Sequence, residues 1–349
     1  MGTITVLGAG GLTGRRLVRA LGERGHLVTG AADLAAAADA DLAVVAVRDP
    51  DRRAELLGEA ARRGLHAVDA GTDAVVAEVA YDGLDGLARQ AGVVVVPAAG
   101  SAVGDLLAAT ALAAVRGPVE VHVTWAFPDR GGWRKAVAPG LRGRAAGVLA
   151  RPMPVLLDGR HTEELAGEAR RLAWFPRPIG PAHAAAVPGP DPLAVQRYAP
   201  GLRVARTYLA VSAWRAELLQ GTANAVRAPW LRAVVQRRWE RGDEPVEGAA
   251  APRWACVVES RGTAGEVARA WAYGRDVVGL GVDAVVALSE AILAGHADAG
   301  ATPPARIEVP ATLLDQLSAR GRLRWSVARP ATTESDAAAS TEPERPDGR

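Results

Sequence analysis

Short apolar runs alternate with amphipathic stretches along the first third of the chain. The apolar runs predict strands at 3–7, 25–29, 42–47, 66–69 and 93–96. Apolar residues at helical spacing predict helices at 12–23, 51–63, 75–90 and 104–115. Strands that alternate with helices form a parallel sheet covered on both faces, and the fully apolar runs 43–47 and 93–96 suit its centre. The sequence therefore predicts an α/β domain.

The pattern changes near Gly117-Pro118, where a second domain is expected to begin. All nine tryptophans and both phenylalanines lie at Trp125 or beyond. Apolar and polar residues alternate at 120–125, 204–211 and 254–259, which predicts a mainly antiparallel sheet with one covered face. A helix is expected at 230–240, and the Pro/Gly-rich stretch 175–192 predicts a loop. This half is expected to be α+β.

A glycine-rich turn, Gly8-Ala9-Gly10-Gly11-Leu12-Thr13-Gly14, follows the first predicted strand and opens the first predicted helix. Glycines let the backbone approach a pyrophosphate, and the free amides and dipole of a helix N-terminus favour its negative charge. The alternative is a turn that only packs helix against strand. The strand-turn-helix-strand setting favours dinucleotide binding. The predicted contacts are Gly8, Gly10, Gly11, Leu12, Thr13 and Gly14.

Asp33 lies 19 positions after Gly14, at the end of the second predicted strand. An acid about 20 residues after the turn accepts hydrogen bonds from the adenosine ribose. A carboxylate also repels the 2′-phosphate of NADP(H), so NAD(H) is the expected cofactor. Asp33 could instead, or in addition, cap a following helix. The end of the third strand adds Ala46, Val47 and Arg48 to the predicted cofactor contacts.

These patterns give an α/β fold class: an N-terminal Rossmann-type parallel sheet and a second α+β domain containing a mainly antiparallel sheet. Residues 1–117 are expected to form the dinucleotide-binding domain, completed by an apolar helix at 277–295. Residues 118–276 and 296–330 are assigned to a substrate or dimerisation domain. The final residues, 331–349, have no periodic apolar pattern and are expected to be disordered.

Composition narrows the function. A formal net charge of +2 over 349 residues does not indicate nucleic acid as a partner. The single cysteine, Cys256, excludes an intramolecular disulfide and favours the cytoplasm. Apolar runs stay below the roughly 20 residues of a membrane span, so a soluble protein with no membrane partner is expected. Metal-ligand spacing, hydrolase GxSxG and kinase GxxxxGK[ST] motifs are absent from the sequence, and no metal is expected.

The tryptophan-rich second half predicts either an aromatic substrate cleft or a homodimer interface, beside ordinary core packing. A small or carrier-bound metabolite is the expected substrate. The basic stretch 237–241 with Trp230 and Trp239 is less favoured as an exposed face for a partner or membrane surface.

Hydride transfer needs a proton donor or acceptor beside the substrate, at the ends of the strands. Asp69 is the best such residue in the first domain, although it could equally be a turn aspartate satisfied by amides. Ser101 suits a helix cap as well as a ligand contact. In the second domain the candidates for proton transfer or carboxylate binding are His122, Lys135, Tyr198, Arg130 and Arg275. Lys135, the only lysine, could act as acid or base if the fold buries it.

The sequence resembles the saccharopine dehydrogenase-like oxidoreductases, including the trans-acting enoyl reductase branch. Beyond the glycine turn, the likeness rests on 60–69 (AARRGLHAVD), 92–100 (GVVVVPAAG), 254–259, the Gly-Arg-Asp at 274–276, and 309–314. The resemblance implies NAD(P)-dependent hydride transfer to or from a C=N, C=O or activated C=C bond, in primary or natural-product metabolism.

One departure separates the chain from that family. The segment between the second strand and Leu42 is short, which predicts a reduced adenosine pocket. Two alternatives therefore remain: a non-redox cyclase, isomerase or lyase that keeps the scaffold around an apolar cleft, and a non-catalytic nucleotide sensor.

Overall fold

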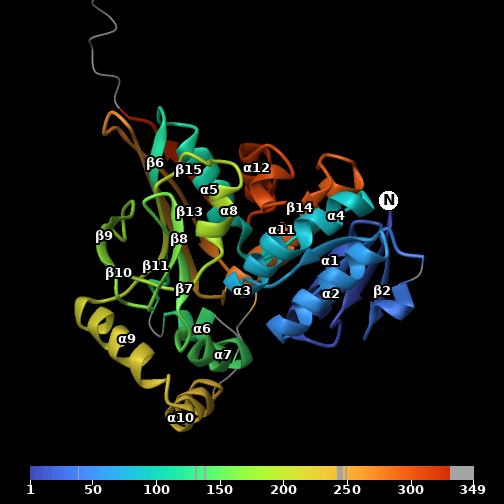
Figure 1. Ribbon diagram of the computed structural model, residues 1–349, viewed down its shortest axis with the longest axis horizontal. Helices are drawn as coiled ribbons and strands as arrows, with labels where there is room; N and C mark the ends of the chain where they lie inside the picture. The colour runs from blue at the N-terminus through green and yellow to red at the C-terminus, as the bar shows by residue number, and fades with distance from the viewer. Residues whose placement is uncertain (38, 130–131, 137–138, 242–246, 248–249, 331–349) are drawn as a thin grey trace, which may run out of the picture.

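The computed structural model describes residues 1–349 except 38, 130–131, 137–138, 242–246, 248–249 and 331–349 (Figure 1). The expected disordered tail lies outside the described residues. Two sheets, one built mainly from each half of the chain, flank a set of shared helices. Among the described residues, no helix is both long and apolar enough to cross a membrane.

The first sheet has six parallel strands in the order β14-β5-β4-β3-β1-β2. This confirms the Rossmann-type parallel sheet. The last strand departs from the predicted division of the chain, because Gly300 and Ala301 pair with β5 in the first sheet and not with the second. The strands are β1 (Thr3–Leu7), β2 (Leu27–Ala31), β3 (Leu42–Val45), β4 (His66–Asp69), β5 (Val94–Val96) and β14 (Gly300–Ala301).

Helices cover both faces of this sheet, as alternating strands and helices require. One face packs on α1 (Leu12–Glu23) and α11 (Val277–Leu293) through residues such as Ile4 and Val44. The other face packs on α2 (Pro50–Arg62) through residues such as Val45. The single helix expected at 75–90 is divided into α3 (Ala74–Glu78), a π-helical turn (Val79–Leu84) and α4 (Asp85–Ala91).

β2 forms an edge of the sheet, and its only partner among the described residues is β1. A single 3₁₀ turn at Leu34–Ala37 connects it to β3. The connection is too short for a further helix and strand. The structure thus has the short connection that the sequence indicated. No helix or strand of the described residues follows β2 to cover its outer side.

The second sheet has the strand order β15-β13-β12-β6-β11-β10-β9, with β7 joined to β11 and β8. All its pairs are antiparallel except β6 with β11, which confirms the mainly antiparallel sheet. The strands are β6 (Pro118–Ala126), β7 (Met153–Leu157), β8 (Arg160–Glu164), β9 (Arg170–Trp174), β10 (Pro181–Ala186), β11 (Val204–Ala210), β12 (Arg253–Gly262), β13 (Val267–Arg275) and β15 (Leu323–Ala328).

The loop predicted at 175–192 is wrong in part. It contains β10 and the first residues of α8 (Asp191–Gln196). Local propensity does not favour a strand in this Pro/Gly-rich stretch, but backbone hydrogen bonds to β9 and β11 stabilise one. Pro181 stands at the first position of the strand, where a missing N–H is tolerated.

Among the described elements, α5 (Ala102–Leu112), α11 and α12 (Pro310–Ala319) lie between the sheets. One continuous apolar core joins Ile4 of the first sheet, Leu106 of α5, Val285 of α11 and Val258 of the second sheet. The remaining helices are α6 (Trp133–Ala136), α7 (Pro139–Leu149), α9 (Ala213–Ala225) and α10 (Pro229–Trp239), which gather at the lower end of the molecule (Figure 1).

Gly14 is required by the packing of α1 against the turn. A Cβ there would clash with the Gly8 carbonyl oxygen and lie 2.8 Å from the Ala9 Cα, and neither backbone atom is free to move. We expect Gly14→Ala to lower the free energy of unfolding by about 2 kcal/mol in urea titrations. Gly22→Ala, in the same helix with nothing within 4 Å of the new Cβ, should not destabilise the protein. Equal stability of the two variants would contradict this packing argument.

Candidate functional site

A cleft of about 540 Å³ lies between the two sheets, at the carboxyl ends of β4 and β5. The first domain lines it with Thr13, with residues 70 and 72–74 after β4, and with Gly100 and Ser101 after β5. The start of α11 and the helices α7, α9 and α10 complete the walls. Lining residues from the second domain include Trp125, Phe127, Asp191, Thr207, Leu209, Val148, Leu149, Arg215, Leu218, Leu219, Thr222 and Trp239.

The glycine turn lies beside this cleft, because Thr13 belongs to the first turn of α1 and also lines the cavity. α1 begins after Gly11 without a side-chain cap and has no acidic residue in its first turn. A Cβ on Gly10 would meet no described heavy atom within 4 Å, and one on Gly11 only the Gly8 carbonyl oxygen at 3.5 Å. Packing within the protein therefore does not demand glycine at these two positions.

Gly8 is needed for the turn itself. It has φ +85°, and a Cβ would lie 2.8 Å from the Ala46 carbonyl oxygen. The predicted contacts Ala46 and Val47 thus lie directly against the turn, while Arg48 is exposed beyond them. Leu12 is half-buried in the first turn of α1. The predicted phosphate-binding residues are gathered at one end of β1 and β3.

Asp33 is exposed just beyond β2. Its Oδ1 accepts a hydrogen bond from the Ala35 N–H at 2.9 Å, at the start of the 3₁₀ turn. The capping role weighed from the sequence is therefore present. A role in ribose binding is compatible with it and stays a prediction.

Asp69 is completely buried beneath the cleft and is not among its lining residues. Its carboxylate accepts hydrogen bonds from the N–H groups of Gly71 (2.9 Å) and Ala98 (3.1 Å), and Arg53 lies 3.4 Å away. Burial raises the pKa of Asp69, and Arg53 opposes that rise. This is the turn aspartate that the sequence left open as the alternative: it ties the end of β4 to the end of β5. Ser101 does line the cleft, but its hydroxyl donates to the Ala98 carbonyl at 2.9 Å and does not cap α5.

His122, Lys135 and Tyr198 are not brought together, and none is among the described lining residues. Val121 and Val123 face the shared core, so the alternation of β6 turns His122 to the opposite face, against the Tyr208 ring. Burial and nearby arginines lower the pKa of His122 to about 3, which keeps the ring neutral. Lys135 is exposed on α6. Arg130 lies outside the described residues.

Tyr198 instead takes part in a partly buried polar contact. Its hydroxyl donates to Asp105 Oδ1 at 2.6 Å, and Asp105 Oδ2 accepts from the Ala305 N–H at 2.8 Å. Arg275 donates to the Ala251 carbonyl at 3.0 Å. These side chains connect segments of the fold, which is a structural role.

Asp191 is the carboxylate that the sequence analysis missed. It is buried at the start of α8, lines the cleft, and accepts a hydrogen bond from Thr207 Oγ1 at 2.7 Å. Burial raises its pKa to about 6, against the opposing effect of Thr207. The only other charged residues among the described lining residues are Asp73, which is ion-paired with Arg53, and the exposed Arg215. A weak signal was available, since Asp191 is the only acid between Glu168 and Glu217.

Asp105 makes the stability of the protein depend on pH. Burial raises the pKa of Asp105 to about 7, from an ordinary value of 3.8. Between about pH 4 and pH 7 the folded protein therefore holds a proton that the unfolded chain releases, so the free energy of unfolding falls as pH rises. We expect a loss on the order of 3 kcal/mol from pH 5 to pH 8, part of which Asp105→Asn removes. Urea unfolding at both pH values tests this, with the exposed Asp158→Asn as control; an unchanged pH dependence in Asp105→Asn would contradict it.

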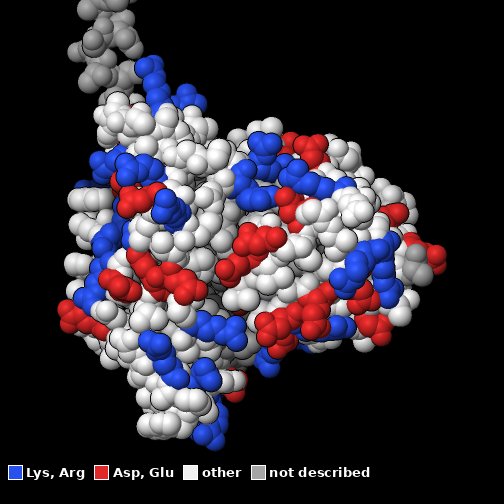
Figure 2. All heavy atoms as spheres, viewed as in Figure 1, with Lys and Arg blue, Asp and Glu red and all other residues white. Residues whose placement is uncertain are grey.

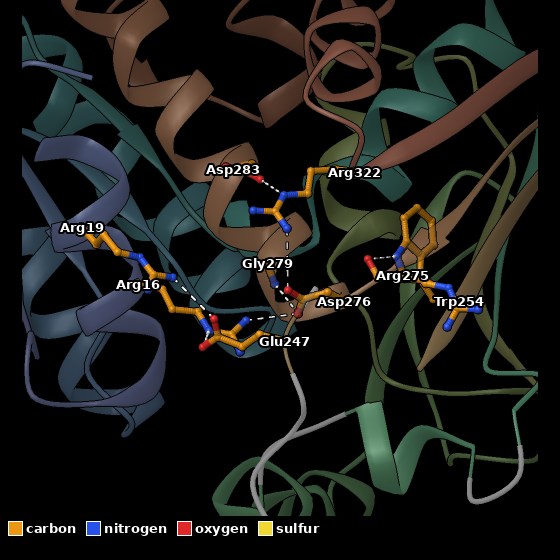
Figure 3. Close-up of polar contacts among 9 residues, drawn as sticks. All are labelled: Arg16, Arg19, Glu247, Trp254, Arg275, Asp276, Gly279, Asp283 and Arg322. Carbon is orange, nitrogen blue, oxygen red and sulfur yellow. Dashed lines mark hydrogen bonds and ion pairs between the residues drawn. The ribbon is translucent and has the colours of Figure 1, made fainter. Parts of the chain in front are cut away.

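A polar cluster joins the glycine-turn helix to the wall of the cleft (Figure 3). Arg16 of α1 is buried, and its Nη1 lies 3.1 Å from Asp276 Oδ1. The same oxygen caps α11 by accepting from the Gly279 N–H at 2.9 Å. Arg16 Nε also contacts the half-exposed Glu247 at 2.9 Å, and Arg322 Nη1 lies 3.7 Å from Asp276 Oδ2. Asp276 thus fixes both the first turn of α11, which lines the cleft, and the position of α1.

Comparison with known proteins identifies the fold. No family model matches the sequence, and neither does any curated protein. Among solved structures, apo saccharopine dehydrogenase (L-Glu forming) from Saccharomyces cerevisiae is similar with a TM-score of 0.54 and 10% identity, over 94% of this chain and all of that one. Aspartate semialdehyde dehydrogenase II from Vibrio cholerae gives a TM-score of 0.41 at 10% identity, over 84% of this chain and 99% of that one. At such identities the likeness to the yeast enzyme shows a shared two-part fold across nearly the whole chain, in agreement with the Rossmann-type architecture.

Proposed function

We propose that the protein is an NAD(P)-dependent oxidoreductase that transfers a hydride to or from a C=N, C=O or activated C=C bond of an apolar small or carrier-bound metabolite. The observation that carries the proposal is the position of Thr13, which joins the open N-terminus of α1 to the cleft. Ligands of open α/β sheets bind at the carboxyl ends of the strands, where the strand order reverses. Here β1 lies between β2 and β3, so the reversal falls at the glycine turn.

The turn fits the pyrophosphate of a dinucleotide. Gly10 and Gly11 leave open the space that a side chain would fill, and the uncapped amides of α1 point to an anion. Asp33, at the end of β2, suits the adenosine ribose and disfavours a 2′-phosphate, which supports NAD(H) over NADP(H). Residues after β4 and β5 extend the path into the cleft.

Within the cleft, the side chains position the substrate and move a proton. A bound nicotinamide would supply or accept the hydride. We assign Asp191 the transfer of the proton, since a pKa near 6 keeps both of its forms populated near neutral pH. Thr207 holds one oxygen of that carboxyl group. Trp125, Leu209 and Leu219 give the cleft apolar walls, which suit an apolar substrate and exclude water from the reacting atoms.

Binding of the reduced cofactor is the first experiment. NADH and NADPH are titrated into the protein while tryptophan emission and energy transfer to the nicotinamide are followed, since Trp125 and Trp239 line the cleft. We expect saturable binding with NADH preferred, and a smaller preference in Asp33→Ala. A folded protein that binds neither would overturn the redox proposal.

Gly11→Ala tests cofactor binding while leaving the stability of the fold nearly unchanged. The added Cβ meets only an ordinary contact within the protein, so the free energy of unfolding should change by less than about 1 kcal/mol. It would, however, occupy the approach to the pyrophosphate, and we expect NADH affinity to fall at least about tenfold. The same titration on Gly22→Ala, a surface glycine of the same helix, should give wild-type affinity. Unchanged affinity in Gly11→Ala would place the pyrophosphate elsewhere.

A non-redox cyclase, isomerase or lyase is the second candidate, and the edge position of β2 favours it. With only a 3₁₀ turn after β2, the adenosine half has less protein to contact. Asp191 in an apolar cleft could also serve as the acid or base of such a reaction. If NADH fails to bind, proton exchange into apolar substrates catalysed by the wild type and lost in Asp191→Asn would support this candidate.

A further inference from the structure

Two neighbouring helices leave large apolar side chains in contact with solvent. On α9, Trp214 and Leu218 are four residues apart and are 61% and 58% exposed. On α10, Trp230 and Val234 have the same spacing and are 71% and 47% exposed. Of the eleven large apolar residues exposed in the described part of the chain, these four fall within 21 positions. The two helices meet at one apolar cluster, on which Leu219 of α9 and Val235 and Trp239 of α10 pack, so the exposed pairs lie on one lobe of the molecule and mark an interaction surface.

The same segment is strongly basic. Residues 213–241 contain six arginines against two glutamates, whereas the whole protein has a formal charge of only +2. The lower lobe is correspondingly white and blue on the face in view (Figure 2). The Arg215 guanidinium lies over the Trp214 ring, 5.1 Å from its centre, so charge and apolar surface are in contact. The arginines are Arg215, Arg227, Arg232, Arg237, Arg238 and Arg241.

This surface is continuous with the cleft. Arg215 and Leu218 are exposed, and both also line the cavity. Leu219, Thr222 and Trp239 continue the lining inward from the same two helices. The cleft therefore reaches the surface at Arg215 and Leu218, beside the exposed Trp214.

We propose that α9 and α10 form a lipid-docking face that holds the protein on an anionic membrane surface, with this opening of the cleft toward the lipid. Tryptophan suits the boundary between headgroups and acyl chains, and arginines are attracted to anionic lipids. The sequence led us to expect no membrane partner and left a membrane surface at Trp230, Trp239 and 237–241 as the less favoured interpretation, because which positions of the two helices are exposed is set by tertiary packing. An apolar substrate would enter the cleft from the bilayer.

Vesicle flotation tests docking without any cofactor, so its result is independent of the proposed redox chemistry. The full-length protein is mixed with vesicles of phosphatidylcholine alone or with phosphatidylglycerol added. We expect binding to the anionic vesicles only, and its loss in about 1 M salt, where the screening length is about 3 Å.

Variants locate the face. Trp214→Ala/Trp230→Ala should weaken binding to the anionic vesicles about tenfold or more. Arg237→Gln/Arg238→Gln should weaken it by about fivefold for each arginine. The matched controls are Trp174→Ala, on β9, and Arg160→Gln/Arg324→Gln, all exposed elsewhere, and these should bind as the wild type does. Circular dichroism confirms that each variant is folded.

The proposal is overturned if the wild type ignores anionic vesicles, or if the control variants lose binding as much as the face variants do. Sedimentation equilibrium identifies the competing occupant. A wild-type dimer that Trp214→Ala/Trp230→Ala converts to a monomer, together with no vesicle binding, would make the face an interface between two copies of this chain.

Discussion

Asp191→Asn is expected to lower kcat by about 10²–10⁴-fold while leaving NADH affinity within about twofold. Asparagine keeps the size of the side chain and an oxygen to accept the Thr207 hydrogen bond, but it has no proton to exchange. The measurement is NADH oxidation with whichever apolar aldehyde, ketone, imine or enoyl thioester the wild type reduces.

The pH profile distinguishes proton transfer from a structural role. Wild-type kcat should change with an apparent pKa near 6, the value to which burial raises Asp191, and this dependence should vanish in Asp191→Asn. Thr207→Val removes the hydrogen bond that favours the ionised carboxylate, so it should move the same feature to higher pH. A variant Asp191→Asn that retains kcat within a few-fold would assign the proton to another group or to water.

Asp276→Ala is expected to lower the free energy of unfolding by about 3 kcal/mol, because it leaves the buried Arg16 guanidinium without one of its carboxylate partners. The change also removes the N-terminal cap of α11. Glu247 still contacts Arg16 but is half-exposed, so it compensates only in part. Equilibrium unfolding in urea measures the loss.

Asp276→Asn is the matched control for this pair. Asparagine can still cap α11 and tolerates the positive φ of this position, +55°, so it isolates the loss of charge. It should be destabilised less than Asp276→Ala. If both variants matched the wild type, Arg16 would be adequately paired through Glu247 alone, and the link between α1 and α11 would contribute little to stability.

The first domain was largely predictable because its signals are local. Short apolar runs between amphipathic helical stretches predict β1, β3, β4 and β5. The glycines of the turn are required by contacts with residues only a few positions away. At Gly14, for instance, a side chain would clash with the backbone of Gly8 and Ala9. The short connection between β2 and Leu42 was also visible in the sequence, and the structure has only a 3₁₀ turn there.

The chemistry of the cleft was not predictable, because it depends on contacts between distant segments. Alternation along β6 showed that His122 and Val123 face opposite ways, but only tertiary packing decides which face meets the first domain. Asp191 becomes distinctive only when α8 places it against Thr207 and buries it. Asp69 was correctly placed at the end of a strand beside the cleft. Its carboxylate, however, already accepts hydrogen bonds from the Gly71 and Ala98 N–H groups and so does not face a substrate.

The position of β14 has a consequence for how the chain folds as it is made. The first sheet is completed by Gly300 and Ala301, and one of its faces is covered by α11, so elements from the last quarter of the chain close a domain that begins at Thr3. During synthesis the N-terminal domain cannot complete its fold until that quarter leaves the ribosome. Until then the apolar side of α1 and β1 is incompletely covered. The two sheets should then fold together, since the core between them is built from residues of both.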